Sequence, residues 1–285
     1  MSSNPLQQRE KRAKIINNFA FAATIIIAIL VMFPIWWIIR SSLMNNAELY
    51  KIPPHIVPPS WLFSNYPKAM NHFPFWRYLF NTMTIIVPSV LSGTITATMC
   101  AYAFARLRFP GKKFLFSLCV GSMLLPAMVT LIPLYIMWSR TPLMGTYWPL
   151  ILPFLCGGGA FNIFLIRQFM RTIPMELDEA AYIDGAGYGT ILVKIIVPAV
   201  KPAMIVVALL LFIMLWNDLL QQTIYIHQTE MFTIAIGLTQ FKGSLMQDWV
   251  MLMCATCMSF IPGVIFFLIG QRYFMEGIVL TGMKN

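Results

Sequence analysis

Charged residues are scarce in this chain of 285 residues, at 11%, whereas hydrophobic residues make up 59%. A soluble domain contains about 25% charged residues, so this composition excludes a soluble globular protein and indicates a membrane protein. Acidic residues are the rarer kind of charge, with ten Asp and Glu against twenty Lys and Arg and a formal net charge of +10. In so apolar a chain, this excess reflects membrane topology rather than nucleic-acid binding.

Histidine and cysteine are too few and too scattered to indicate a metal or redox centre. The sequence holds three histidines and five cysteines, at His55, His72, His227, Cys100, Cys119, Cys156, Cys254 and Cys257. An odd set of cysteines in apolar segments is no disulfide framework, and the histidines lack metal-ligand spacing. The C-x-x-C pair lies in an apolar stretch, where helix packing explains it. No Ser/His/Asp cluster occurs either, so we predict no metal site and no catalytic residue.

A phosphate-binding loop is also missing. Gly111-Lys112-Lys113 lacks both the upstream glycine and the following Ser or Thr of a P-loop. The run Gly157-Gly158-Gly159 has no nearby lysine, and in an apolar stretch it suits close helix packing or local unwinding. The chain therefore binds no cofactor of its own, and if ATP powers this protein, another chain must bind it.

Six apolar stretches are present, each close to or above the roughly 20 residues that cross a bilayer. They run over about 19–39, 80–105, 114–137, 148–166, 203–224 and 249–274. The first is longer than the core of a signal peptide, and no small-residue cleavage site follows it, so we interpret it as a retained anchor. Because backbone groups in lipid must pair internally, the sequence predicts an all-α bundle of six transmembrane helices.

The loops between these stretches differ in positive charge. With both termini in the cytoplasm, the inner segments hold 14 Lys and Arg and the outer segments hold 6, as the positive-inside rule requires. All eight tryptophans fall in the outer halves or outer loops, where interfacial aromatics are common. We therefore expect a cytoplasmic segment at 1–18 and one transmembrane domain over 19–285. An extracytoplasmic loop would lie at 40–76 and a cytoplasmic loop at 169–202.

The cytoplasmic loop at 169–202 has the clearest local pattern. Pro174 suits the first turn of a helix, and acidic residues follow where a helix N-terminus favours anions. Leu177, Ala180 and Ala181 form a narrow apolar stripe at helical spacing. A glycine turn comes next, and then a second amphipathic piece that ends at Pro198 and Pro202. Periodicity alone describes an ordinary helix-turn-helix connector.

The residues of this loop resemble the EAA loop found in the membrane subunits of ABC importers. The string EAAYIDGA at 179–186, followed by a proline-containing helix, is similar to the carbohydrate-uptake (maltose-type) branch of that family. The resemblance implies the fold of a type I ABC importer permease, in which this loop is the coupling helix that docks into a cleft on the ATPase subunit. It assigns this coupling to Glu179, Ala180, Ala181, Asp184, Gly185, Ala186 and Pro198.

Two polar groups are candidates for a translocation path. Asp218 is the one acidic residue inside a predicted span. Asn217, Gln221 and Gln222 share its side of the helix. The triplet Trp216-Asn217-Asp218 also resembles a signature of the carbohydrate branch. Thr94 and Thr98 form a second polar line, although threonines often bond back to their own helix. A polar contact between helices explains both groups equally well.

The resemblance also implies the partners. The C-terminal Thr281, Gly282 and Lys284 are similar to a family tail that reaches between the ATPase subunits. The chain would be a multi-pass protein of the bacterial inner membrane and form half of the path for a sugar or oligosaccharide. Its expected partners are a second homologous permease in a heterodimer, two ATP-binding subunits that hold ATP and Mg²⁺, an extracytoplasmic solute-binding protein and membrane lipids.

Two other classes of transporter remain open. The first is an ABC permease for a different solute, such as an amino acid or phosphate. An anionic solute favours positive charge in the path, and the interiors of the spans carry no Lys or Arg. The second is an ion-coupled secondary transporter, which normally carries several intramembrane acids or histidines. Residues 219–222 depart from the aromatic, apolar run of the carbohydrate branch, so the identity of the solute stays open.

Overall fold

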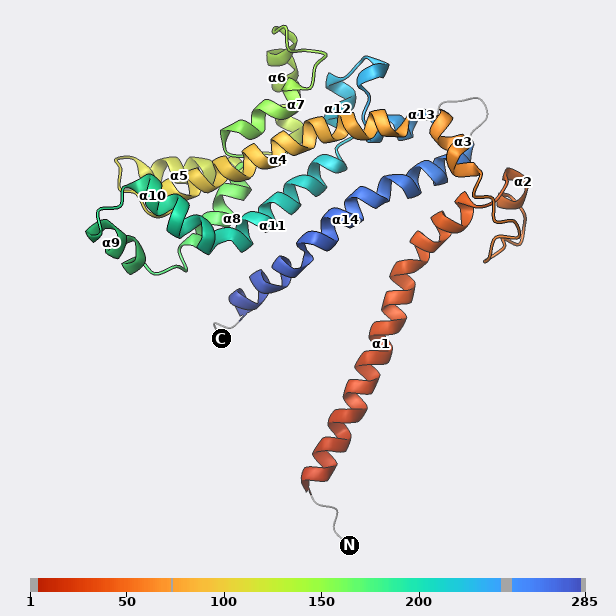
Figure 1. Ribbon diagram of the computed structural model, residues 1–285, viewed down its shortest axis with the longest axis horizontal. Coiled ribbons are helices and arrows are strands. Elements are labelled where there is room, and N and C mark those ends of the chain that lie inside the picture. Colours follow the sequence, from red (N-terminus) through yellow and green to blue (C-terminus); the bar gives the residue numbers. More distant parts are fainter. Residues whose placement is uncertain (1–4, 73, 242–247, 283–285) are drawn as a thin grey trace. The chain divides into compact units, whose positions relative to one another are not determined.

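The computed structural model describes residues 5–72, 74–241 and 248–282, with side chains described over 14–72, 74–241 and 248–272 (Figure 1). Within these ranges the elements are helices, and none is a strand. Five helices are long and apolar enough to cross a membrane: Lys14–Ser42, Phe75–Ala105, Trp148–Met170, Tyr188–Trp216 and Trp249–Arg272. A bent pair, Lys112–Ser122 with Ala127–Ser139, gives a sixth span if it counts as one. The all-α prediction is confirmed, with five spans, or the predicted six if the bent pair is one.

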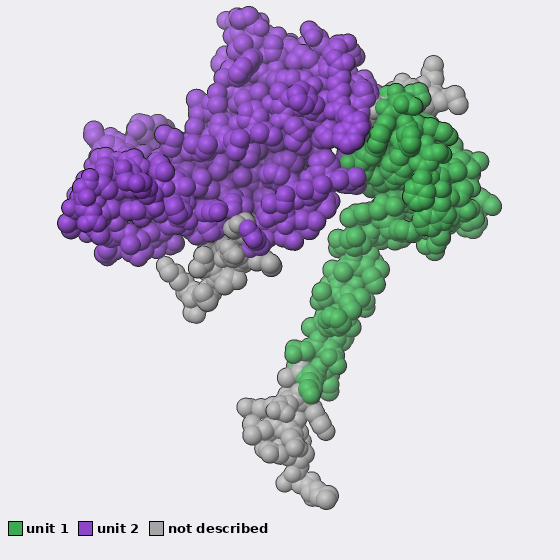
Figure 2. Space-filling view, viewed as in Figure 1, with its two compact units in different colours: residues 1–73, 241–258 green, residues 74–240, 259–285 purple. Residues whose placement is uncertain are grey.

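Contacts divide the chain into two compact units, 1–73 with 241–258 and 74–240 with 259–285 (Figure 2). The first unit contains α1 (Pro5–Ser42), α2 (Asn46–Leu49), α3 (Asn65–His72) and the start of α14 (Trp249–Gly282). The side chain of Asn65 donates to the carbonyls of Ser42 and Met44 at 3.0 and 2.9 Å. The predicted loop at 40–76 is therefore an ordered segment with two short helices. One domain over 19–285 stays a prediction.

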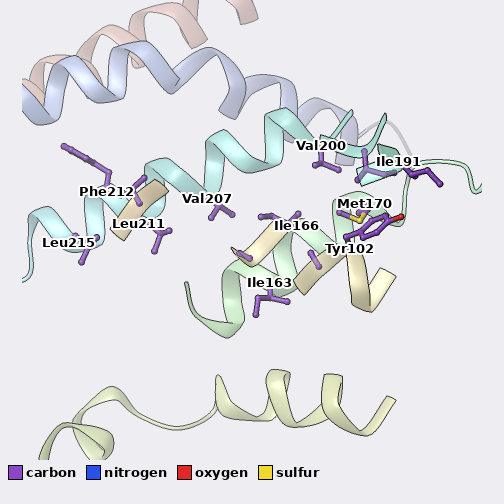
Figure 3. Close-up of a cluster of buried hydrophobic side chains, with 14 of the residues drawn as sticks. Tyr102, Ile163, Ile166, Met170, Ile191, Val200, Val207, Leu211, Phe212 and Leu215 are labelled. Atoms are coloured by element: carbon purple, nitrogen blue, oxygen red, sulfur yellow. The ribbon is translucent and has the colours of Figure 1, made fainter. Parts of the chain in front are cut away.

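Three helices form the centre of the second unit: α4 (Phe75–Ala105), α8 (Ala160–Met170) and α11 (Val197–Trp216). Apolar side chains from these helices fill the space between them, among them Ile163, Ile166, Met170, Val200, Val207 and Leu211 (Figure 3). On α4 the packed face carries Gly93, Ala97 and Ala101, all buried and four residues apart. Such a row of small residues lets neighbouring helices approach closely.

The fourth span is interrupted by its glycines. After α7 (Trp148–Ile151) and the 3₁₀ turn η1 (Leu152–Cys156), the residues Gly157, Gly158 and Gly159 all have positive φ, at 102°, 62° and 104°. Thr96 of α4 accepts the Gly157 N–H at 3.0 Å, so a side chain of the neighbouring helix satisfies a backbone group that the break leaves open. Both uses expected of the glycine run, unwinding and close packing, are confirmed.

The boundaries of the third and fifth spans differ from the prediction. The third span bends by 99° at the break between α5 (Lys112–Ser122) and α6 (Ala127–Ser139), and Pro126 is the N-cap of α6. The predicted bounds of the fifth span, 203–224, are wrong, because the observed span is Tyr188–Trp216. Its helix runs through α10 (Tyr188–Ile191), the π turn η2 (Leu192–Ile196) and α11. Pro198 lies in the first turn of α11, just after the wide turn, and Pro202 lies inside it.

These prolines therefore do not end a helix, contrary to the sequence prediction. A proline removes a single backbone donor, and a membrane helix tolerates that loss where local π adjustments satisfy the freed groups. The connection between the fourth and fifth spans shortens accordingly, from the predicted 169–202 to 171–187. Beyond α11 the chain forms α12 (Leu220–Tyr225), η3 (Thr229–Met231) and α13 (Ile234–Gln240).

Candidate coupling helix and polar turn

The connection at 171–187 is built around the short helix α9 (Glu176–Ile183). Pro174 lies just before this helix rather than in its first turn, and Met175 accepts the N–H groups of Asp178 and Glu179 at 2.9 and 3.1 Å. Three acids stand in the first turn, Glu176, Asp178 and Glu179, where the helix dipole favours negative charge.

The helix ends in a turn with two backbone hydrogen bonds, and this turn explains why a glycine stands at position 185. The N–H of Gly185 donates to the Tyr182 carbonyl at 3.0 Å, and the N–H of Ala186 donates to the Ala181 carbonyl at 2.9 Å. These two bonds form a Schellman motif, which places one residue in the left-handed region. That residue is Gly185, with φ of 81°. The predicted glycine turn is confirmed, and only Gly185 of its two glycines has positive φ.

The inner face of α9 is polar at its centre. Asp178 forms an ion pair with Arg106 at 3.0 Å from Nε to Oδ2, and the two side chains are 10% and 5% exposed. The same guanidinium donates to the Ile173 carbonyl at 2.9 Å and to the sulfur of Met175. Burial raises the pKa of the Asp178 carboxyl above its ordinary value, although the Arg106 charge partly opposes the shift.

The apolar stripe predicted from Leu177, Ala180 and Ala181 is therefore wrong in part. Ala181 is buried, whereas Leu177 is 48% exposed and Ala180 is also exposed. Asp178 takes the buried position because Arg106 supplies the opposite charge that makes burial tolerable. Sequence reasoning missed both residues of this pair. The available signal was the spacing of Asp178, three positions before the buried Ala181.

The outer face of α9 is open and carries both apolar and acidic groups. Large apolar side chains are exposed there, with Ile183 at 86%, Leu177 at 48% and Tyr182 at 47%. The rings of Tyr182 and Tyr188 pack edge to face across the glycine turn, with centroids 5.2 Å apart. Of the residues assigned to coupling, Glu179, Ala180, Asp184 and Gly185 are exposed, Ala181 is buried and Ala186 is half-buried. Pro198 lies on α11, outside this connection.

The polar triplet at the end of the fifth span forms a turn between two helices. Asn217 caps α11, and its side chain donates to the Ile213 carbonyl at 2.8 Å. The Asp218 carboxylate accepts the N–H of Gln221 at 3.1 Å, in the first turn of α12. Because α11 ends at Trp216, the prediction that Asp218 lies inside a span is wrong. The turn leaves Asn217 and Gln221 exposed and Asp218 half-buried.

Gln222 has a structural role that the sequence did not reveal. The helical spacing predicts it on the same side of the helix as Asp218, Asn217 and Gln221, but its side chain is buried, at 2% exposed. Its amide nitrogen donates to the Leu215 carbonyl at 3.1 Å, and its oxygen accepts from Thr233. This side chain therefore ties the polar turn to the segment before α13.

The two threonines of α4 lie inside the helix packing. Thr94 and Thr98 are 7% and 2% exposed. The Thr98 hydroxyl donates to the Thr94 carbonyl at 2.8 Å, so this threonine bonds back to its own helix, as threonines often do. Within this chain they form no open surface, and the structure does not bring them together with the exposed polar turn. A place on the translocation path stays a prediction.

The expected contacts of the C-terminal tail fall where the structure describes no side chains. Lys284 lies outside the described residues, and so do the side chains of Thr281 and Gly282. Over the ranges that the structure describes, no three His, Cys, Asp or Glu side chains gather as a metal site would require.

Comparisons with known proteins agree with this geometry. A family model described as "Binding-protein-dependent transport system inner membrane component" matches residues 89–278. The chain is 31% identical to the "Probable ABC transporter permease protein YurM" of Bacillus subtilis, over 90% of this chain and 85% of the relative. It is 28% identical to the "Arabinooligosaccharides transport system permease protein AraQ" of Halalkalibacterium halodurans, over 94% and 95%.

Two solved structures share the fold. The first is a chain of a bacterial ABC transporter involved in the import of the acidic polysaccharide alginate. It has a TM-score of 0.81 and 25% identity, over 93% of this chain and 98% of that chain. The second is a chain of a bacterial alginate ABC transporter in complex with an alginate pentasaccharide-bound periplasmic protein. Its TM-score is 0.60 at 15% identity, over 98% and 99%, a likeness of fold alone.

Proposed function

Because the chain belongs to the family of binding-protein-dependent transport system inner membrane components, we propose that it is the permease subunit of an ABC importer for a sugar or oligosaccharide, and that α9 couples it to an ATPase subunit. It lies in the bacterial inner membrane and works with a solute-binding protein, as the family description says. It is a transport component, and the hydrolysis of ATP belongs to other subunits.

The open outer face of α9 is the observation that carries the coupling role. Ile183, Leu177 and Tyr182 expose large apolar surfaces outside the predicted spans, where water would otherwise cover them. Exposed apolar surface next to acids is typical of an interaction site. The small Ala180 lets a partner approach the backbone, and Glu179 offers a carboxylate to a basic group at the rim. The Schellman turn fixes the end of α9 within this chain, so the helix is already formed before a partner binds. Such a preformed, exposed helix suits a cleft on an ATPase subunit.

A carbohydrate fits as the solute for two reasons. Relatives that match almost the whole chain carry names of oligosaccharide transport systems. The exposed Asn217 and Gln221, next to Asp218, offer amide groups that suit the hydroxyls of a sugar. This polar turn is our candidate for a contact with the solute.

The assembly would contain this chain, a second homologous permease and two ATP-binding subunits. ATP and Mg²⁺ would be held by those subunits, and their closure on ATP would move the two coupling helices together and open the path outward. The C-terminal residues Thr281, Gly282 and Lys284 would reach the ATPase pair.

Co-purification tests the proposal directly. The tagged chain is extracted from its native membrane, and the proteins that accompany it are identified by mass spectrometry. Two ATP-binding subunits and a second permease should be present. Ala180→Trp adds bulk to the open face without touching the buried one, so it should reduce the retained ATPase by about tenfold. Ser64→Trp, an exposed position in the loop of the first unit, is the matched control. Retention of the ATPase by the Ala180→Trp variant would refute docking at α9.

A further inference from the structure

A single arginine fastens the inner side of α9 to the end of α4. Arg106 follows the last residue of α4 and continues its hydrogen bonding, since its N–H donates to the Tyr102 carbonyl at 2.8 Å. Its guanidinium contacts the Asp178 carboxylate, the Ile173 carbonyl and the Met175 sulfur. These three contacts hold both the first turn of α9 and the residues just before it.

The pair is costly for a contact that only stabilises the fold. Removing two charges from water carries a desolvation cost that their attraction often fails to offset. The raised pKa of Asp178 shows that its burial outweighs the Arg106 charge, and its second oxygen, Oδ1, has no hydrogen-bond partner. An apolar pair would fill this space at lower cost. What the charged pair adds, together with the hydrogen bond from Arg106 to the Ile173 carbonyl, is a fixed position of one helix relative to another.

The helix α4, which ends next to Arg106, is well placed to transmit a displacement of α9 along the second unit. α4 packs along α8 and α11, and Figure 1 shows α9 near one end of it and α13 near the other. At that far end, the Asn81 side chain donates to the carbonyls of Glu230 and Phe232, both at 2.9 Å. α4 is thus held by polar side chains at both ends, with close helix packing between them.

We propose that Arg106 and Asp178 are positioning residues that make α4 follow the displacement of the coupling helix α9. The inference rests on the proposed function, because it requires α9 to be the element that an ATPase moves. The docking surface is the outer face of α9, and the pair lies on the inner face. Docking and transmission are therefore separable in the same helix.

The test separates binding of the ATPase from the coupling of hydrolysis to uptake. Arg106→Gln and Asp178→Asn each leave one partner of the pair without its opposite charge. In reconstituted vesicles that contain the full complex and its solute-binding protein, both should retain the ATPase and its basal hydrolysis. Uptake, and hydrolysis stimulated by the loaded binding protein, should fall by about tenfold or more. Arg108→Gln, an exposed arginine two residues further on, is the control and should behave as wild type.

Conservative variants keep the test decisive if the neutral ones fold poorly. Arg106→Lys keeps the charge but cannot make three contacts at once from one planar group, and Asp178→Glu lengthens the acid by one methylene. Both should fold and bind the ATPase while coupling falls several-fold. The double exchange Arg106→Glu with Asp178→Arg restores opposite charges at the pair. Its coupling of hydrolysis to uptake should be at least threefold higher than that of either single exchange.

The outcomes are distinct for each hypothesis. Normal coupling in Arg106→Lys and Asp178→Glu, or release of the ATPase in step with coupling, would overturn the positioning role and leave a purely structural pair. If the wild-type complex contains no ATP-binding subunit, the proposed function itself fails, whatever these variants do.

Discussion

At the scale of single residues, two positions show how a local hydrogen bond decides what a substitution will do. Gly185 lies at the left-handed position of a Schellman turn, and a Cβ added there would meet no atom within 4 Å. The cost of a side chain is therefore backbone strain alone. Asp218 accepts the N–H of Gln221, so its carboxylate serves the start of α12.

Gly185→Val should distort the end of α9 and turn its docking face away from the partner. A left-handed conformation costs a residue with a Cβ about 1–2 kcal/mol, enough to reduce binding of the ATPase by about fivefold to thirtyfold. Gly189→Ala, in α10 with open space around it and no positive φ, is the control. Quantitative co-purification measures both variants, and an unchanged ATPase content in Gly185→Val would contradict this reading of the turn.

Asp218→Asn should keep most of the transport, whereas Asp218→Leu should lose more. An asparagine oxygen can still accept the Gln221 N–H, and a leucine cannot, at a cost of about 0.5–1.5 kcal/mol for a lost hydrogen bond. Uptake of labelled solute together with the thermal midpoint of the purified complex tests this. If asparagine alone abolished uptake, the carboxyl would act through its charge or its proton, and an ion-coupled mechanism would gain support.

At the scale of elements, the interrupted fourth span packs backbone against backbone on α4. A Cβ on Gly158 would lie 2.8 Å from the Cα of Gly93 and 2.7 Å from its carbonyl oxygen. Backbone cannot yield as a flexible side chain does, so the two glycines fix how closely α4 approaches the break. The positive φ of Gly158 adds a second constraint.

Gly158→Ala should therefore destabilise the second unit by about 2–5 kcal/mol, the sum of about 1–3 kcal/mol for overpacking and about 1–2 kcal/mol for a left-handed alanine. Gly121→Ala, with no atom within 4 Å and no positive φ, should change stability little. Thermal inactivation of the purified complex compares them. Equal midpoints would show that the α4 contact tolerates a methyl group and that the break is not fixed by packing.

At the scale of the whole molecule, the orientation in the membrane follows from charge. The division of Lys and Arg into 14 inner and 6 outer residues predicts that the connection at 171–187 faces the cytoplasm. Single cysteines at Ser64 and Thr229, in a background without the five native ones, should react with an impermeant thiol reagent in intact cells. Cysteines at Glu176 and Tyr188 should react only after the membrane is opened. All four positions are exposed in the structure, so accessibility within the fold does not distort the comparison. The opposite labelling pattern would invert the topology.

Much of this protein could be predicted from short stretches of sequence. The apolar runs determined a six-span helical membrane protein, because hydrophobicity and length act within each stretch. The string EAAYIDGA located the candidate coupling helix, and Gly185 marked its turn, because a left-handed position favours glycine locally.

Only the tertiary structure decided features that depend on a partner far away in the chain. Asp178 is buried and Leu177 exposed because Arg106 at the end of another helix supplies the compensating charge, and no periodicity within 173–202 contains that information. The fifth span begins at Tyr188 and passes Pro198 because a wide turn absorbs the proline. Asp218 lies in a turn rather than in a span because α11 ends at Trp216, where Gln222 is held by Thr233 and the backbone of Leu215. For Asp178 and Gln222 the deciding free energy comes from a contact between segments, which a sequence reveals only once it is folded. For Pro198 it comes from the backbone hydrogen bonding of the adjacent wide turn, which hydrophobic periodicity does not show.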